Sequence, residues 1–201
     1  MKIRCIEDLI RWEDLITEES KAKLQAIGRP SKLALKKTPE NLDDITLGQL
    51  ITLWRIKDER DLFYLSAICV LAYDDNDRRY NFKQKLIGRR LRHTGAGKAI
   101  GWSNFVSNEL LRINEMWQKC NVPLTDIDRQ AGADNLNFGF FSIIDAYAQR
   151  QGITDHDDVL KVKWIKVWQS LQKDAEIAKF QLRRERILEN RFKQNKTKNE
   201  H

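Results

Sequence analysis

Hydrophobic residues recur at three- and four-residue spacing along most of this chain, which is the pattern of amphipathic α-helices. Prolines are few and glycines fall in a handful of places, so long helices joined by a few distinct loops are expected. Short strands over residues 2–6 and 31–35 stay open as alternatives. The fold class predicted is therefore mainly α, with helices over residues 6–16, 18–27, 45–56, 58–73, 81–93, 103–120, 137–151 and from 154 into the tail near 195.

Polar residues mark the predicted helix ends. Thr46 and Gln49 fit a capping box, in which each side chain binds a backbone N–H of the other residue. Ser103 is expected to cap the helix that follows the Thr94–Lys98 break, and Thr154 is expected to cap the last helix. These signals divide the chain into an N-terminal helical segment (1–27), an extended linker or arm (28–44), a helical core (45–152) and a long C-terminal helix with a basic tail (153–201).

The last helix is unusually long for one domain. Without a break it would extend on the order of 50 Å at 1.5 Å per residue. Its apolar stripe thins after Leu182, where Arg183 and Arg184 begin a basic stretch. We therefore expect the helix to project beyond its own domain and, with the arm at 28–44, to reach other chains. The residues predicted for an oligomer interface are Trp164, Trp168, Leu171, Arg183 and Arg184.

Positive charge is concentrated in one part of the chain. The net charge is +7, and no acidic residue occurs between Asp77 and Glu109. Aromatic and aliphatic residues alternate with the cations, which indicates a folded basic surface rather than a disordered tail. An anionic counterpart is expected, either a nucleic-acid backbone, an acidic neighbouring subunit or solvent counterions. The residues predicted to bind it are Arg78, Arg79, Lys83, Lys85, Arg89, Arg90, Arg92, Lys98 and Trp102.

Tryptophan is enriched where proteins meet, and an interface anchor is the alternative to core packing for Trp102 and Trp168. Core packing is the expectation for most of the other tryptophans. Cys69 lies in an apolar run and is expected to be a buried thiol.

Catalytic and metal-binding motifs are weak. Thr94–Ala99 lacks both the first glycine and the hydroxyl residue that a phosphate-binding loop needs. Asp155–Asp158 contains a single histidine and is better explained as a charged helix start than as a metal site. Without a nucleophile–base pair, no enzyme activity, cofactor or catalytic residue is predicted. The chain has no apolar run of membrane-spanning length and no signal-peptide core, so a protein made in the cytoplasm is expected.

Two segments resemble small helical proteins of tailed bacteriophages. Asp43–Leu50 is similar to the start of the first helix in tail-assembly and connector proteins, and Asn137–Asp145 is similar to their C-terminal part. The composition suggests a phage of a Bacteroidetes host, such as the crAss-like group. The resemblance implies a virion component: a ring or adaptor subunit at the head–tail connector or tail, made in the host cytoplasm, that forms homo-oligomers and binds other phage structural proteins.

Two other functions remain open at this point. One is a tail-assembly chaperone that is absent from the finished particle. The other is a nonspecific nucleic-acid-binding protein, whose DNA binding would weaken steeply with salt and would be lost when Arg89, Arg90 and Arg92 are changed to glutamate.

Overall fold

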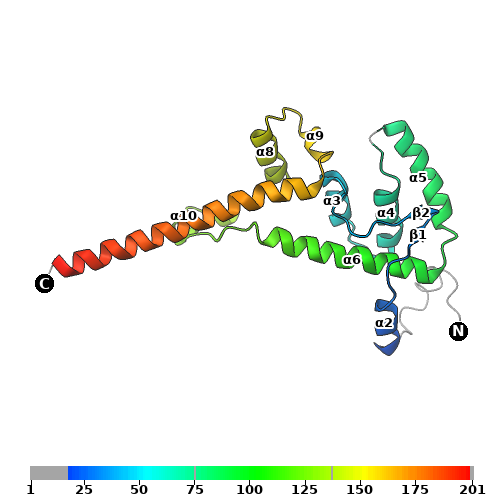
Figure 1. Ribbon diagram of the computed structural model, residues 1–201, viewed down its shortest axis with the longest axis horizontal. Coiled ribbons are helices and arrows are strands. Elements are labelled where there is room, and N and C mark those ends of the chain that lie inside the picture. Colours follow the sequence, from blue (N-terminus) through cyan, green and yellow to red (C-terminus); the bar gives the residue numbers. More distant parts are fainter. Residues whose placement is uncertain (1–17, 75, 137, 200–201) are drawn as a thin grey trace. The chain divides into compact units, whose positions relative to one another are not determined.

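The computed structural model describes residues 18–74, 76–136 and 138–199 (Figure 1). The helix predicted over residues 6–16 and the strand alternative at 2–6 lie outside the described residues. The mainly helical fold and the long C-terminal helix are confirmed. The elements are α2 (Glu18–Gln25), β1 (Lys32–Leu33), β2 (Lys36–Lys37), α3 (Leu47–Trp54), α4 (Glu59–Leu71), α5 (Asp77–Leu91), α6 (Ala96–Gln118), α7 (Asp126–Gln130), the 3-10 turn η2 (Ala133–Asn135), α8 (Phe140–Gln151), α9 (His156–Leu160) and α10 (Trp164–Asn199).

The chain divides into two compact units. Unit 1 comprises Met1–Ile113 and Leu160–Trp164, and unit 2 comprises Asn114–Val159 and Ile165–His201. This division differs from the sequential boundary at 152–153 that the sequence suggested, because the segment before α10 returns to unit 1. There the N–H of Leu47 donates to Val162 O (2.8 Å) and the N–H of Trp164 donates to Ile45 O (3.2 Å).

The same return segment interrupts the predicted last helix. The helix begun at His156 ends at Leu160, and α10 starts only at Trp164. Lys163 lies in a bridge with Thr46, so its backbone is extended between the two helices. With 36 residues, α10 still has a length of about 54 Å.

The core of unit 1 is formed by α4, α5, α6 and the hairpin β1–β2. Its largest buried side chain is Trp102, whose Nε1–H donates to Ser66 Oγ (2.9 Å). The Ser66 hydroxyl donates in turn to Leu62 O, so both polar groups in this apolar region are satisfied. The cluster contains Leu33, Phe63, Ala67, Ile68, Ala72, Ile87, Leu91, Ala99, Trp102 and Val106.

The segment 28–44, predicted to be an arm that docks on another chain, is packed on its own unit. Leu33 and Leu42 are fully buried, and the Arg29 guanidinium binds the hydroxyl of Thr38 (2.8 Å). The N–H of Leu42 donates to the Glu109 carboxylate on α6 (2.8 Å). The segment is therefore not a free linker, because Leu33 and Leu42 fill the core of the same chain, while its contact with another chain stays a prediction.

Helix starts were predicted with mixed success. The capping box of α3 is confirmed, since Gln49 N–H donates to Thr46 Oγ1 (3.2 Å) and Thr46 N–H donates to Gln49 Oε1 (2.9 Å). Ser103, in contrast, lies inside α6, which begins seven residues earlier at Ala96. α5 likewise begins at Asp77 rather than 81, because the Asn76 side chain accepts from Arg79 N–H (3.1 Å) and caps it.

Unit 2 is held by polar contacts of α10 with earlier segments. The Trp168 Nε1–H donates to Met116 O (2.9 Å), and the Lys179 ammonium donates to Lys119 O (2.5 Å). Arg150 of α8 binds Asp174 and also Ser170 O (3.1 Å). α8 ends at Gln151 and is capped by Gly152, whose φ of 67° is left-handed and suits a residue without a side chain.

Glu109 makes the stability of unit 1 depend on pH. Burial alone would raise the pKa of Glu109, but hydrogen bonds from Arg112 and from Leu42 N–H, together with the Arg112 charge, hold it below the ordinary value of 4.5. A depressed pKa stabilises the folded state above the unfolded pKa, and this stabilisation is lost as the pH falls through the folded pKa. We expect the free energy of unfolding to decline with pH below about 4.5.

Urea titrations between pH 3 and 7 measure this decline. Glu109→Gln should lower the free energy of unfolding by about 1.5–3 kcal/mol at pH 7 and flatten its pH dependence. The exposed Glu115 on the same helix provides the control variant, Glu115→Gln, which should leave the pH dependence unchanged. An unaltered pH dependence in Glu109→Gln would contradict the assignment.

Candidate nucleic-acid interface

Helix α5 presents one half to the core and the other half to solvent. Ile87 and Leu91 are buried on the inner side. Gly88 lies so close to α4 that a Cβ atom there would be 2.6 Å from Tyr64 Oη. Packing therefore fixes which face of α5 is exposed.

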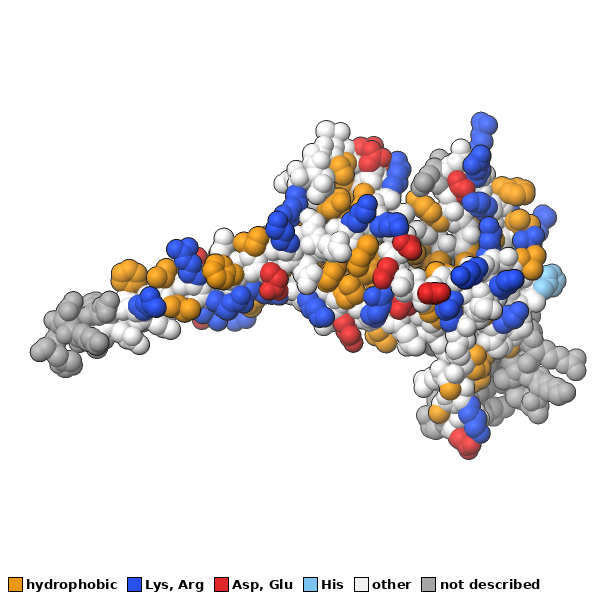
Figure 2. All heavy atoms as spheres, viewed as in Figure 1, with side chains coloured by type: hydrophobic (Ala, Val, Ile, Leu, Met, Phe, Trp, Pro, Cys, Tyr) orange, Lys and Arg blue, Asp and Glu red, His pale blue; other side chains and the backbone are white. Residues whose placement is uncertain are grey.

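The outer half of α5 carries all of its cations. At 3.6 residues per turn, these residues fall within about half of the helix circumference, and Phe82 lies at the centre of that half. The phenyl ring of Phe82 is 68% exposed. Figure 2 shows Lys and Arg side chains gathered over the α5 side of unit 1. We call the following residues the basic surface: Lys32, Lys36, Arg78, Arg79, Lys83, Lys85, Arg89, Arg90, Arg92 and Lys98.

The hairpin β1–β2 brings the first two of these cations to α5. Lys32 pairs with Lys37 and Leu33 with Lys36, which leaves Ala34 and Leu35 as a two-residue turn. Both turn residues have positive φ, 48° and 64°, in the left-handed region that glycine and asparagine favour. Each costs on the order of 1 kcal/mol there. The Leu35 side chain is 78% exposed, so burial does not compensate for this strain.

A first groove of about 430 Å³ lies between the hairpin and α5. Its apolar lining comes from Phe82, Leu86 and Ile87. Its basic lining consists of Lys36, Arg78, Arg79, Lys83 and Arg90.

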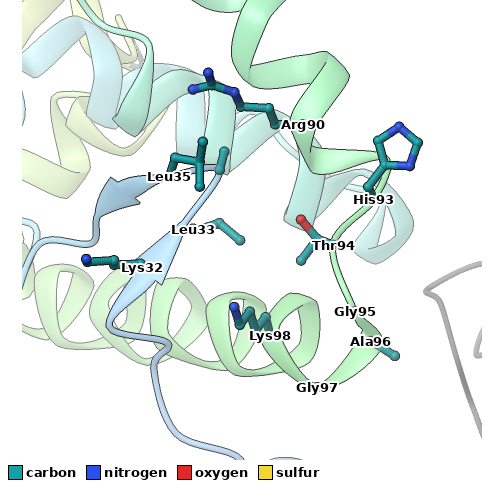
Figure 3. Close-up of a pocket in the computed structure, with 11 residues that line it drawn as sticks. Lys32, Leu33, Leu35, Arg90, His93, Thr94, Gly95, Ala96, Gly97 and Lys98 are labelled. Carbon is teal, nitrogen blue, oxygen red and sulfur yellow. The ribbon is translucent and has the colours of Figure 1, made fainter.

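A second groove of about 840 Å³ lies on the other side of Arg90 (Figure 3). Leu33 and Leu35 of the hairpin form its apolar wall, and Thr94–Lys98 forms the opposite wall at the start of α6. Lys32, Arg90, His93 and Lys98 supply its basic groups. Arg90 lines both grooves, which makes them neighbouring parts of one surface.

Carboxylates neutralise little of this surface. Lys83 pairs with Asp74 (2.5 Å), and this hydrogen bond, followed by the one from Asn76 N–H, lowers the pKa of Asp74. Among the side chains that the structure describes, the other cations of the basic surface have no carboxylate within ion-pair distance. The surface is therefore a local excess of positive charge with an apolar centre.

The structure brings the eight predicted cations, from Arg78 to Lys98, onto one unit beside the hairpin. Trp102 does not belong with them: it is fully buried, so its prediction as a partner-binding residue is corrected. Lys32 and Lys36 are members of the basic surface that the sequence reasoning missed, as is the exposed Leu35 beside them. The paired lysines at 36 and 37 and the strand alternative at 31–35 were the available signals.

One residue of the predicted oligomer interface on the last helix, Trp164, needs correction; the half-buried Trp168 stays a prediction. Trp164 is fully buried and donates from Nε1 to Leu42 O (2.6 Å), and Trp168 is bonded within unit 2. Leu171 is half-buried, whereas Arg183 and Arg184 are exposed and stay predictions.

A different row of α10 is exposed. At 3.6 residues per turn, this row lies roughly 140° around the helix axis from the buried stripe that contains Trp164 and Ala175. Figure 1 shows this part of α10 continuing past the other elements of unit 2. We call it the outer row, and its members are Ile177, Phe180, Ile187, Leu188 and Phe192.

The structure gives no support for metal binding by the Asp155–Asp158 segment among the described residues. His156 packs edge-on against Phe141 (5.4 Å between ring centroids) and lies 3.4 Å from Asp145. Within the described ranges, no group of three or more acidic, histidine or cysteine side chains is arranged to hold a metal ion. No helix in the described part of the chain is long and apolar enough to span a membrane.

Comparison with known proteins gives no relative. No protein-family model, curated protein or solved structure matches the chain.

Proposed function

We propose that this protein is a non-enzymatic subunit of a nucleoprotein assembly and that unit 1 binds the phosphate backbone of nucleic acid through the basic surface. One observation carries the proposal: the cations of α5, the hairpin and the start of α6 face one side, with little carboxylate neutralisation among the described side chains. A row of fixed positive charges favours a polyanion with regularly spaced charges.

The binding is not expected to read base sequence. Lysine and arginine contacts with phosphates position a protein on nucleic acid, whereas sequence is read by groups placed on base edges. Around Phe82, α5 presents mainly lysine and arginine side chains; Asn81 is adjacent, and Gln84 lies on the opposite side of the helix. Affinity should therefore depend on length and salt rather than on sequence.

A salt titration tests the proposal. We expect fluorescence anisotropy with labelled oligonucleotides of mixed sequence to give binding at 50 mM salt that falls at least 10³-fold by 200 mM, with a linear log–log dependence for six or more phosphate contacts. Binding that is insensitive to salt, or absent while an acidic protein is bound instead, would overturn the proposal.

The outer row of α10 supports membership of a larger assembly. The partner that fits it is a helix that carries both apolar side chains and carboxylates, because Arg184 and Arg191 lie within the row at seven-residue spacing. An identical copy would place these arginines near each other, so a chain of different sequence is the better match.

The particular assembly we propose is the head–tail connector or tail ring of a tailed phage, on the resemblance of Asp43–Leu50 and Asn137–Asp145. Mass spectrometry of purified virions tests this step. Stoichiometric presence in the particle is the expected result. Presence in infected cells but absence from the particle would favour a tail-assembly chaperone instead.

A further inference from the structure

We infer that the preferred ligand of the basic surface is single-stranded nucleic acid, with Phe82 as a stacking platform and the two grooves as places for unpaired bases. This inference rests on the proposed function and names its substrate class. It follows from the apolar groups in the middle of the surface, which phosphate binding alone does not require.

Phe82 is the first of these groups. Its ring is 68% exposed, although α5 already buries Ile87 and Leu91 in the core, so the ring is not needed for packing. Arg78 and Arg89 lie one and two turns away on the same side of the helix. A base stacked on the ring would therefore have cations in reach of its 5′ and 3′ phosphates. Stacking of this kind tolerates every base, because each base has a π-face.

The grooves are the second group. Both are lined by apolar side chains together with lysine and arginine, which matches a base that packs on the apolar groups while its phosphate contacts the cations. Arg90 lies at the boundary between them and can contact the phosphate that joins two adjacent nucleotides. A planar guanidinium also stacks on bases.

The hairpin turn is the third group. Ala34 and Leu35 both have left-handed backbone conformations, and they place the exposed Leu35 side chain beside the larger groove. Backbone strain of this kind is typical of functional positions. A duplex offers phosphates on its outside but keeps its bases paired, so its bases would not stack on Phe82 or pack on Leu35 and the other apolar residues that line the grooves.

Competition between the two forms of nucleic acid tests the inference. Fluorescence anisotropy with a labelled oligothymidine of 20 nucleotides and a duplex of equal length, at one salt concentration, should show tighter binding of the single strand by tenfold or more. Phe82→Leu should weaken single-strand binding about tenfold and leave duplex binding unchanged. Phe82→Tyr, which keeps an aromatic face, should restore the affinity.

Phe180→Leu on α10 is the matched control, because Phe180 is 59% exposed but lies outside the basic surface. It should change neither affinity. Equal binding of the two forms with no effect of Phe82→Leu would overturn this inference and leave the proposed function standing. Absence of salt-dependent binding to either form would overturn the proposed function itself. Since Phe82 is exposed, unchanged circular dichroism is expected to confirm that the variants fold.

Discussion

Changing Gly101 to alanine is expected to lower the free energy of unfolding of unit 1 by about 2–4 kcal/mol. A Cβ atom at this position of α6 would lie 2.2 Å from the carbonyl oxygen of Gly28 and 3.1 Å from Ile27 Cγ2. The clash is with backbone, which cannot rotate away as a side chain can. The gain of about 1 kcal/mol that alanine normally brings to a helix is therefore outweighed.

The same contact anchors the end of α2. Asn104, one turn further along α6, donates from Nδ2 to Leu24 O (2.9 Å) in the last turn of α2 and to Ile27 O (3.1 Å) just after the helix. A methyl group at residue 101 would separate these partners as well. The loss should thus include the cap of α2 in addition to the steric cost.

Urea denaturation followed by circular dichroism measures the effect. Gly97→Ala is the control in the same helix, because a Cβ atom there has no neighbour within 4 Å. It should stabilise the protein slightly, by up to about 1 kcal/mol. If both variants were equally stable, the close approach of residues 27–28 to α6 would be refuted.

Local sequence signals predicted the helical part of this fold well. The periodicity of α3 and the capping box of Thr46 with Gln49 act within a few residues, so they can be found without knowledge of the tertiary structure. The two-residue strands of the hairpin are too short for a periodic signal. Its turn, Ala34–Leu35, also lacks the glycine or asparagine that marks such turns in a sequence.

Long-range contacts explain the remaining differences. The break between α9 and α10 results from hydrogen bonds of Val162 and Trp164 to Ile45 and Leu47, more than 100 residues earlier. Residues 160–164 contain no glycine or proline from which this break could have been predicted. Similarly, Leu33 makes residues 28–44 part of the core only because it fits between α4, α5 and α6.

Only part of the candidate site could be predicted from the sequence. Its charge lies in one continuous run, so the cations of α5 could be predicted, but the grooves depend on how the hairpin packs. Trp102 shows the limit of reasoning from residue type. Its indole N–H meets the hydroxyl of Ser66, 36 residues away, which allows the whole side chain to be buried.

Replacing Arg89, Arg90 and Arg92 together with glutamine is expected to reduce nucleic-acid affinity about 10²-fold at 0.1 M salt. Each phosphate contact contributes roughly 0.7 to the slope of log affinity against log salt for a single strand, so three lost contacts lower the slope by about 2. Glutamine is preferred to glutamate because Arg89 and Arg90 lie in the last turn of α5, where an acidic residue would oppose the helix dipole.

The control for this triple variant is Arg183, Arg184 and Arg186 of α10, changed to glutamine in the same way. It removes the same net charge but leaves the basic surface intact. If affinity depended only on the total charge of the protein, the two variants would lose it equally. A loss confined to the α5 variant, with the reduced salt slope, would show that the phosphates contact the cations placed around Phe82. Equal losses would mean that no defined surface exists, and the basic surface would then be a solvated helix face.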